Sequence, residues 1–275
     1  MKRIPALLLL FILTLSAKAQ QQPAPGEPFV LGITEKIPSA QLAETRTLNI
    51  YLPDGYKADT AAYPVIYLLD GSANEDFIHM TGLVQFLTMI KKMPPAIVVG
   101  IANVDRRRDF THIVDVNSPQ VQKDMQQSPT AGGSAKFMAF IEKELQPYIQ
   151  QHYRVTGKTT IVGQSLGGLL ASEILLKKPA LFNNYLIVSP SLWWSDESML
   201  KRAPALLKEN LHNDVRVYIA VGSEGKVMIG DAEQLAKDLG TAGRHVKVQY
   251  APMPEENHLT ILHNSAYKGF EALFR

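Results

Sequence analysis

The chain of 275 residues contains no cysteine and only two tryptophans, and it has no apolar run of membrane-spanning length. Without cysteine there is no disulfide framework, no cysteine nucleophile, no thiolate metal site and no lipidated N-terminal cysteine. No pair of histidine or acidic residues shows zinc-ligand spacing. The fold must therefore depend on its apolar core, which 46% hydrophobic residues can supply in one domain of this length.

The first 19 residues have the order of a secretory signal peptide. Lys2 and Arg3 form a positive segment, Ala6 to Leu15 form an apolar segment, and Ala17-Lys18-Ala19 offers a cleavage site. A membrane-spanning helix would need roughly 20 apolar residues, about twice as many as this segment has. We therefore predict cleavage after Ala19, a periplasmic or secreted protein, and no membrane insertion of the mature chain.

Cleavage would also change the charge balance. It lowers the number of Lys and Arg from 28 to 25 against 26 acidic residues, so the mature chain is close to neutral. The run Arg106 to Arg108 is short and flanked by Asp105 and Asp109, and no basic stripe with interleaved aromatics predicts a nucleic-acid partner. Residues 20–28, rich in Gln and Pro, predict a flexible leader, and residues 29–275 predict one domain.

Short apolar runs alternate with helical stretches along this domain. Residues 46–52 alternate apolar and polar side chains, which favours a half-buried strand at an antiparallel edge. Continuous short runs indicate strands buried on both faces, and the stretches between them indicate helices, so the pattern predicts an α/β fold with a mostly parallel sheet of about eight strands. The runs are 65–69, 96–99, 160–162, 185–188, 215–221 and 246–250, and the helical stretches include 135–152, 166–178 and 231–239.

The segment Gly163-Gln164-Ser165-Leu166-Gly167 is the most informative motif. It follows a β-branched strand and precedes a helix, which is the setting of the nucleophile elbow in α/β-hydrolases. There a serine lies in a strained turn at the start of a helix, whose N–H groups face the reacting carbonyl. We predict that Ser165 is the nucleophile; the structural alternative is a serine helix cap beside a packing glycine.

A serine nucleophile needs a base, and in this fold the acid and then the histidine follow it in the chain. His258 lies in a polar loop between the last apparent strand and the final helix, where a catalytic histidine is expected. His212, His245 and His263 fall at a helix end, a strand start and within a helix, which favours surface or packing roles.

Two carboxylates follow the strand 215–221 and are candidates for the acid. Glu224 comes directly after Val221-Gly222-Ser223 and is our first choice. Asp231 is the alternative, although an acidic residue at a helix start has a structural explanation of its own. A serine–histidine dyad without an acid remains the third possibility.

The oxyanion hole should combine two backbone N–H groups. One is that of Leu166, the residue after the nucleophile. The other should come from the loop Asp70-Gly71-Ser72-Ala73 after the strand 65–69, with Gly71 and Ser72 as candidates. An ordinary turn would have the same local sequence.

Several segments together resemble the putative esterase family, over roughly residues 30–275. This family includes trilactone siderophore esterases, feruloyl and acetyl xylan esterases, S-formylglutathione hydrolase and mycolyltransferases. The resemblance implies an α/β-hydrolase fold without a lid domain and cofactor-free ester chemistry. The segments are Tyr67-Leu-Leu-Asp-Gly71, Val99-Gly-Ile-Ala-Asn103 with Arg108-Asp-Phe-Thr111, Gly163-Gln-Ser-Leu-Gly-Gly168 and Ser189-Pro-Ser-Leu-Trp-Trp194.

The resemblance supports Ser165 and His258 as catalytic residues, and the N–H groups of Ser72 and Leu166 as the oxyanion hole. The chain departs from the family at two positions: many members carry His where this chain has Gln164, and an acid where it has Gly225. The second departure leaves the identity of the acid open.

Three further residues are candidates for substrate binding. The resemblance places Trp193 and Trp194 beside the cleft, although an aromatic pair after a strand is commonly core. Arg108, in the Arg106 to Arg108 run, would attract anionic substrates if it faced the cleft, and is otherwise a solvated loop charge.

We therefore predict an exported serine carboxylic-ester hydrolase acting on a small-molecule or glycan ester, such as a siderophore trilactone or an acylated glycan. An acyltransferase of the same fold, and a non-catalytic binding protein on a hydrolase scaffold, are the alternatives.

Overall fold

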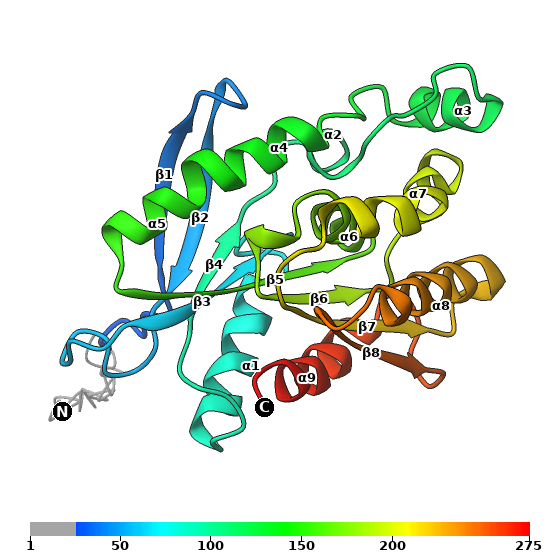
Figure 1. Cartoon of the computed structure of the whole chain (residues 1–275). Coiled ribbons are helices and arrows are strands. Elements are labelled where there is room, and N and C mark those ends of the chain that lie inside the picture. The colour runs from blue at the N-terminus through cyan, green and yellow to red at the C-terminus, as the bar shows by residue number, and fades with distance from the viewer. Residues whose placement is uncertain (1–25) are drawn as a thin grey trace, which may run out of the picture. The chain divides into compact units, whose positions relative to one another are not determined.

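The computed structural model describes residues 26–275, and the predicted signal peptide and most of the predicted leader lie outside this range. Residues 26–30 carry no helix or strand, and the fold below is that of Leu31–Arg275. It is built on one eight-stranded sheet with the order β1-β2-β4-β3-β5-β6-β7-β8 (Figure 1). The strands are β1 (Ile33–Ser39), β2 (Glu44–Tyr51), β3 (Tyr63–Leu68), β4 (Ile97–Ile101), β5 (Val155–Gln164), β6 (Asn184–Val188), β7 (Val215–Gly222) and β8 (Val246–Met253).

Six of these strands, β4, β3 and β5 to β8, run parallel, which confirms the predicted mostly parallel sheet. The pairs β1–β2 and β2–β4 are antiparallel. The predicted edge strand 46–52 corresponds to β2, but it is not at the edge, because β1 pairs with its outer side. Strand β1 was not predicted, because its segment ITEKIPS has several exposed residues and gives only a weak apolar signal.

Helices cover both faces of the sheet. They are α1 (Phe77–Met89), α2 (Arg106–Phe110), α3 (Pro119–Gln127), α4 (Ser134–Phe140), α5 (Gln146–His152), α6 (Leu166–Lys177), α7 (Trp194–Asn210), α8 (Gly225–Thr241) and α9 (Ile261–Leu273). A π turn at Ile141–Leu145 joins α4 to α5, and a single 3₁₀ turn follows at Pro179–Leu181. In the described part of the chain, no helix combines the length and apolar character needed to cross a membrane.

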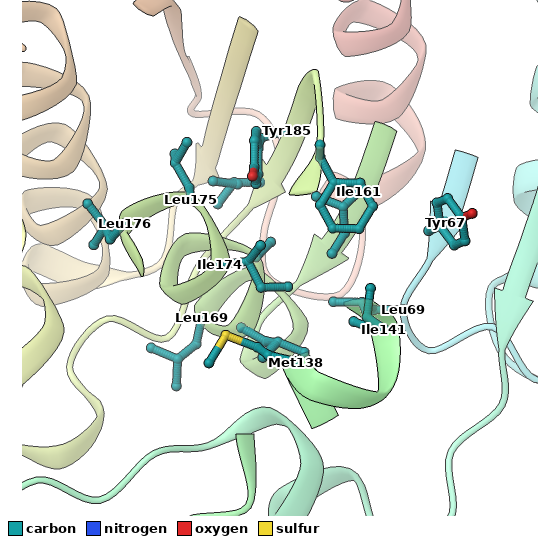
Figure 2. Packing of buried hydrophobic residues seen from close by; sticks show 14 of the residues in the cluster. Tyr67, Leu69, Met138, Ile141, Ile161, Leu169, Ile174, Leu175, Leu176 and Tyr185 are labelled. Carbon is teal, nitrogen blue, oxygen red and sulfur yellow. The ribbon is translucent and has the colours of Figure 1, made fainter. Parts of the chain in front are cut away.

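The alternation of side chains along each strand divides the core into two layers. Val65 and Tyr67 of β3 pack in the layer of α4, α6, α7 and α8, and their neighbours Ile66 and Leu68 pack in the layer of α1 and α9. Figure 2 shows part of the first layer, in which side chains of α6 lie against the sheet. Because both faces are buried, these strands appear in the sequence as continuous apolar runs.

The starts of two helices, α8 and α7, affect the site. The helix predicted to begin at Asp231 begins at Gly225, so Asp231 lies in the second turn of α8 and not at its start. Gly225 has φ 86°, a value that glycine adopts readily and that lets the helix start immediately after Glu224. Helix α7 is interrupted near its start, because Ser195 to Glu197 have left-handed backbone angles.

Candidate active site

Ser165 lies in a sharp turn between β5 and α6, at the carboxyl end of the parallel strands. Its backbone angles, φ 59° and ψ −120°, are strained for a residue with a side chain. The Ser165 N–H donates to the carbonyl of Val188 at 3.0 Å, which ties the turn to β6. This is the backbone geometry of a nucleophile elbow, in which the serine side chain projects from the sheet.

The glycines on either side of the turn allow it to close. A Cβ atom at Gly163 would lie 2.3 Å from the carbonyl oxygen of Gly167, and one at Gly168 would lie 2.9 Å from that of Val188. Side chains at these positions would push α6 away from β5 and β6. The motif therefore requires glycine for close approach of the backbone.

His258 and Glu224 meet at the same edge of the sheet. The imidazole Nδ1 of His258 lies 2.5 Å from Oε2 of Glu224. The Glu224 side chain is only 4% exposed, and its other oxygen accepts from the N–H of Gly222 at 3.1 Å and from the hydroxyl of Ser189. With Nδ1 engaged by a carboxylate, Nε2 is the nitrogen left to exchange protons with a substrate or nucleophile.

Ser165 and His258 line two hollows in common. The first, here called the Trp193 hollow, has a volume of about 400 Å³ and is also lined by Ser191, Trp193 and Met228. The second, the Arg106 hollow, has a volume of about 390 Å³ and is also lined by Asp70, Glu75, Asp76, Arg106 and Leu259. The Oγ of Ser165 lies 3.4 Å from Oγ of Ser191. No hydrogen bond among the described residues joins Ser165 to His258, a contact that commonly tightens only when substrate binds.

The other candidates for the acid and the base lie in different surroundings. Asp231 is buried in α8, and its Oδ2 has no hydrogen-bond partner within residues 26–275. Burial, followed by the nearby charge of Glu197, raises the pKa of Asp231 to about 6. His245 pairs with Asp214 at 2.8 Å, His263 with His79 at 2.7 Å, and His212, just beyond the end of α7, with the backbone carbonyl of Glu209.

The predicted oxyanion donors differ in their present hydrogen bonds. The N–H of Gly71 donates to the carbonyl of Ile101 at 3.0 Å, so this donor is already used within the sheet. Gly71 instead permits close packing, since a Cβ there would lie 2.3 Å from the Cα of Gly100. The N–H of Ser72 donates to the Glu75 carboxylate at 3.2 Å. Leu166 begins α6, where backbone N–H groups have no partner within the helix.

The two tryptophans have separate surroundings. Trp193 is 38% exposed and lines the hollow named after it. Trp194 is buried, and its indole N–H donates to the carbonyl of His112 at 2.7 Å. Of the pair, the structure therefore brings only Trp193 to the surface beside Ser165.

The arginine run is arranged differently from our expectation. Arg106, and not Arg108, lines a hollow beside Ser165. It makes a bidentate ion pair with Asp70, with contacts of 2.6 and 2.8 Å. Arg108 points instead to Glu44 and Asp109. The assignment of Arg108 to substrate binding is therefore not supported by its position, and Arg106 takes its place as the candidate.

Acidic groups outnumber the cation in the Arg106 hollow. Burial, together with the carboxylates of Asp70 and Glu75, raises the pKa of Asp76 to about 6. The side-chain amide of Asn103 joins Asp70 to Glu75, at 2.7 and 3.0 Å. This hollow is a bonded network of opposite charges, not a positive patch.

Sequence reasoning missed three residues that contact the candidate site. Ser189 donates to Glu224, Ser191 lies beside Ser165, and the side-chain amide of Gln164 donates to the backbone carbonyl of His258 at 2.5 Å. The motif Ser189-Pro-Ser191 and the departure at Gln164 were visible in the sequence, but the partners of these side chains depend on tertiary contacts.

Known proteins resemble this chain over most of its length. The model of the family described as Putative esterase matches residues 39–274. The ferri-bacillibactin esterase BesA of Bacillus subtilis (strain 168) is 31% identical over 239 residues, which make up 80% of this chain and 82% of that protein.

Solved structures also resemble this chain over most of its length. An IroE-like serine hydrolase from Shewanella oneidensis has a TM-score of 0.82 at 32% identity, over 88% of this chain and 80% of that one. The BES protein from Bacillus cereus has a TM-score of 0.77 at 29% identity, over 92% of this chain and 100% of that one. Together with the sheet order, these likenesses confirm the predicted α/β-hydrolase fold.

Proposed function

The chain belongs to the putative esterase family, and from this premise we propose that it is an exported serine ester hydrolase with Ser165, His258 and Glu224 as its catalytic triad. The observation that carries the proposal is the 2.5 Å contact between His258 and a buried Glu224, in a hollow that Ser165 also lines. This arrangement supplies a nucleophile, a base and a group that orients the base.

The chemistry follows from these positions. Ser165 Oγ attacks the ester carbonyl while His258 Nε2 takes its proton, and Glu224 stabilises the imidazolium through Nδ1. His258 then gives the proton to the departing alcohol. Water, deprotonated by the same nitrogen, attacks the acyl-enzyme. The bond from the carbonyl carbon to Ser165 Oγ then breaks, His258 returns the proton to Oγ, and the acid leaves.

Charge develops on the carbonyl oxygen during both attacks, and two backbone donors would stabilise it there. Leu166 N–H is one, at the start of α6. Ser72 N–H becomes the other when the substrate oxygen replaces its bond to Glu75, which at 3.2 Å is a long one.

We propose siderophore esters as the substrate class. The relative BesA carries ferri-bacillibactin esterase in its name, and a relative from Emericella nidulans is a siderophore enterobactin esterase. Two hollows of about 400 and 390 Å³ meet at Ser165, which suits an ester that is bulky on both sides of the bond to be broken.

Hydrolysis is favoured over acyl transfer, because the His258 side chain is 39% exposed and water can reach the acyl-enzyme. Transfer to an alcohol would require a site that excludes water.

The purified mature protein should be tested on three ester classes: an iron-free and a ferric trilactone siderophore, a feruloylated or acetylated glycan, and p-nitrophenyl acetate. We expect siderophore esters to give the highest kcat/KM. Ser165→Ala should lower kcat about a million-fold if the triad acts as a unit, and a fluorophosphonate probe should label Ser165. Retention of more than a few per cent of activity would contradict the mechanism. A protein that binds these esters tightly and cleaves none of them would be a binding protein instead.

Export is the second element of the proposal, and it rests on Lys2, Arg3, the apolar segment and Ala17-Lys18-Ala19. N-terminal sequencing of protein recovered outside the cytoplasm should begin at Gln20. An intact Met1 on that material would show that the segment is an anchor.

A further inference from the structure

The backbone next to Trp193 and Trp194 is strained. Ser195, Asp196 and Glu197 have φ values of 53°, 57° and 54°, so three successive residues with side chains adopt the left-handed conformation. Such residues adopt this conformation singly, and it persists only where the surrounding structure enforces it. The segment separates the two tryptophans from the regular part of α7.

Residues of the connection between β4 and α4 hold this segment from one side. Asp124 of α3 is 4% exposed, and its Oδ2 accepts from the N–H of Ser195 at 3.2 Å. Its Oδ1 accepts from Gln120 at 2.8 Å, which fixes the carboxylate. The strained segment is thus hydrogen-bonded to a helical residue that lies 71 positions earlier in the chain.

His112, in the same connection, contacts the chain before and after the strained residues. Its carbonyl accepts from the Trp194 indole at 2.7 Å, and its Nε2 lies 3.0 Å from the hydroxyl of Ser198. His112 and Asp124 therefore clamp residues 194–198 at three points. Trp193 directly precedes these residues, and its carbonyl accepts from the N–H of Glu197 at 3.3 Å.

A buried carboxylate packs beside the His112 ring, without a hydrogen bond between the two among the described residues. The Oε2 of Glu173 lies 3.6 Å from His112 Nδ1, and the Glu173 side chain has no exposure. Burial by itself would raise the pKa of Glu173, but His112 and Lys177 lower it to about 2. Glu173 belongs to α6, the helix that begins directly after Ser165, so the clamp and the candidate nucleophile are attached to one rigid element.

We propose that Asp124 and His112 are positioning residues that hold Trp193 against the Trp193 hollow and thereby set which esters fit beside Ser165. This inference rests on the proposed esterase function. The exposed face of Trp193 binds a planar or apolar part of the substrate, since an indole offers apolar area with little conformational freedom to lose. Loss of the clamp lets residues 195–197 relax to ordinary backbone angles, and Trp193 moves with them.

The chain provides a direct optical test, because its only two tryptophans are Trp193 and Trp194. In Asp124→Ala we expect the fluorescence emission to shift to the red and acrylamide quenching to increase. Asp124→Asn keeps an oxygen acceptor for the Ser195 N–H and should retain the wild-type spectrum. Asp115→Ala is the matched control, because Asp115 is an exposed residue of the same connection whose carboxylate bonds only to the N–H of Asn117.

Kinetics distinguish positioning from a general effect on the fold. Asp124→Ala should raise KM about two- to tenfold for a bulky aromatic ester, the range expected for loss of one aromatic contact. The kcat for p-nitrophenyl acetate, which is too small to need Trp193, should stay unchanged. In a double-mutant cycle, adding Asp124→Ala to Trp193→Ala should have no further effect on KM.

Each result supports or overturns the proposal. Additive effects of Asp124→Ala and Trp193→Ala, or an unchanged emission spectrum in Asp124→Ala, would overturn it. If Asp124→Ala does not fold, Ser198→Ala removes the His112 side-chain contact more gently and should give the same spectral and KM shifts in smaller degree. If the wild type cleaves no ester, the proposed function fails, and the spectral test still decides whether the clamp holds Trp193.

Discussion

Glu224 and His258 are joined by a 2.5 Å contact between Oε2 and Nδ1, although 34 residues separate them in the chain. The carboxylate has two further donors, Ser189 and Gly222, so its position does not depend on His258 alone. A carboxylate held in this way keeps the imidazole in one orientation before any substrate arrives.

A first prediction compares the two candidate acids. We expect Glu224→Gln to lower kcat by up to about ten-thousand-fold, because the amide can present its N–H to Nδ1 and favour the wrong tautomer. Asp231→Asn should keep at least half of the activity, since Asp231 lies buried in α8 and its Oδ2 accepts no hydrogen bond from the part of the chain that the structure describes. Steady-state kinetics on p-nitrophenyl acetate, with folding checked by thermal melts, measure both. If Asp231→Asn loses activity and Glu224→Gln keeps it, Asp231 is the acid. If both variants stay active, the site is a serine–histidine dyad.

A second prediction concerns stability and pH. The pKa of Asp231 is raised to about 6 in the folded protein, while an unfolded aspartate titrates near 4, so between these values the folded state binds more protons. Folding is therefore favoured at the acidic end of this window, and the contribution of Asp231 falls as pH rises from about 4 to about 6. Asparagine does not titrate, so Asp231→Asn removes this loss. The gain in the free energy of unfolding from the substitution should be larger at pH 7 than at pH 4 by about 1 kcal/mol, after allowance for partial solvent screening.

Thermal melts of wild type and Asp231→Asn at both pH values test this prediction. Asp76 also has a pKa raised to about 6 and titrates in the same window, so the difference between the two proteins is the relevant quantity. Glu233→Gln, an exposed change of an acid to its amide on the same helix, is the matched control. An equal effect of Asp231→Asn at pH 4 and pH 7 would contradict the raised pKa.

Much of the fold could be predicted because its signals are local. Continuous apolar runs mark strands buried on both faces, and Gly163 and Ser165 mark a turn whose close contacts need glycine. The positions of Ser165, Glu224 and His258 after β5, β7 and β8 also follow from the topology, since the carboxyl ends of parallel strands meet at one edge.

The remaining features depend on contacts between distant segments. Nothing in the pair Trp193-Trp194 indicates which ring is buried, because the choice depends on the His112 carbonyl, 82 residues away. Arg106 and Arg108 are equivalent in the sequence, yet a short helix turns one toward Asp70 and the other toward Glu44. The early start of α8 was missed because Gly225, which begins it, usually indicates a turn.

A third prediction concerns the length of the acyl chain. The Trp193 hollow has a volume of about 400 Å³, and Leu31–Arg275 forms one unit without a separate lid domain. We expect activity on p-nitrophenyl esters to fall steeply beyond roughly C8, with no activation at a lipid interface, because a small apolar pocket cannot bury a long chain. A series of esters from C2 to C16, measured below and above the solubility limit, tests this. A maximum at C14 or longer would show that the protein is a lipase.

A fourth prediction uses Arg106 and Arg108 as a matched pair. Arg106→Gln removes the bidentate ion pair of Asp70, a residue that is only 7% exposed. Asp70 precedes Gly71 and Ser72, and its φ of 55° shows that this turn is held in a strained conformation. An uncompensated buried carboxylate should disturb the turn and with it the Ser72 donor, so we expect kcat/KM to fall about tenfold or more, equivalent to ~1.4 kcal/mol of transition-state stabilisation.

Arg108→Gln should behave differently. Arg108 pairs with Glu44 at 2.7 Å and with the fully buried Asp109 at 2.8 Å, so its loss should lower the melting temperature. It should leave kcat/KM within about twofold, because neither partner lines the hollows beside Ser165. Both variants should be assayed at a temperature where thermal melts show them folded. A large loss of kcat/KM in Arg108→Gln, with Arg106→Gln unaffected, would restore the assignment based on sequence and remove Arg106 from the candidate site.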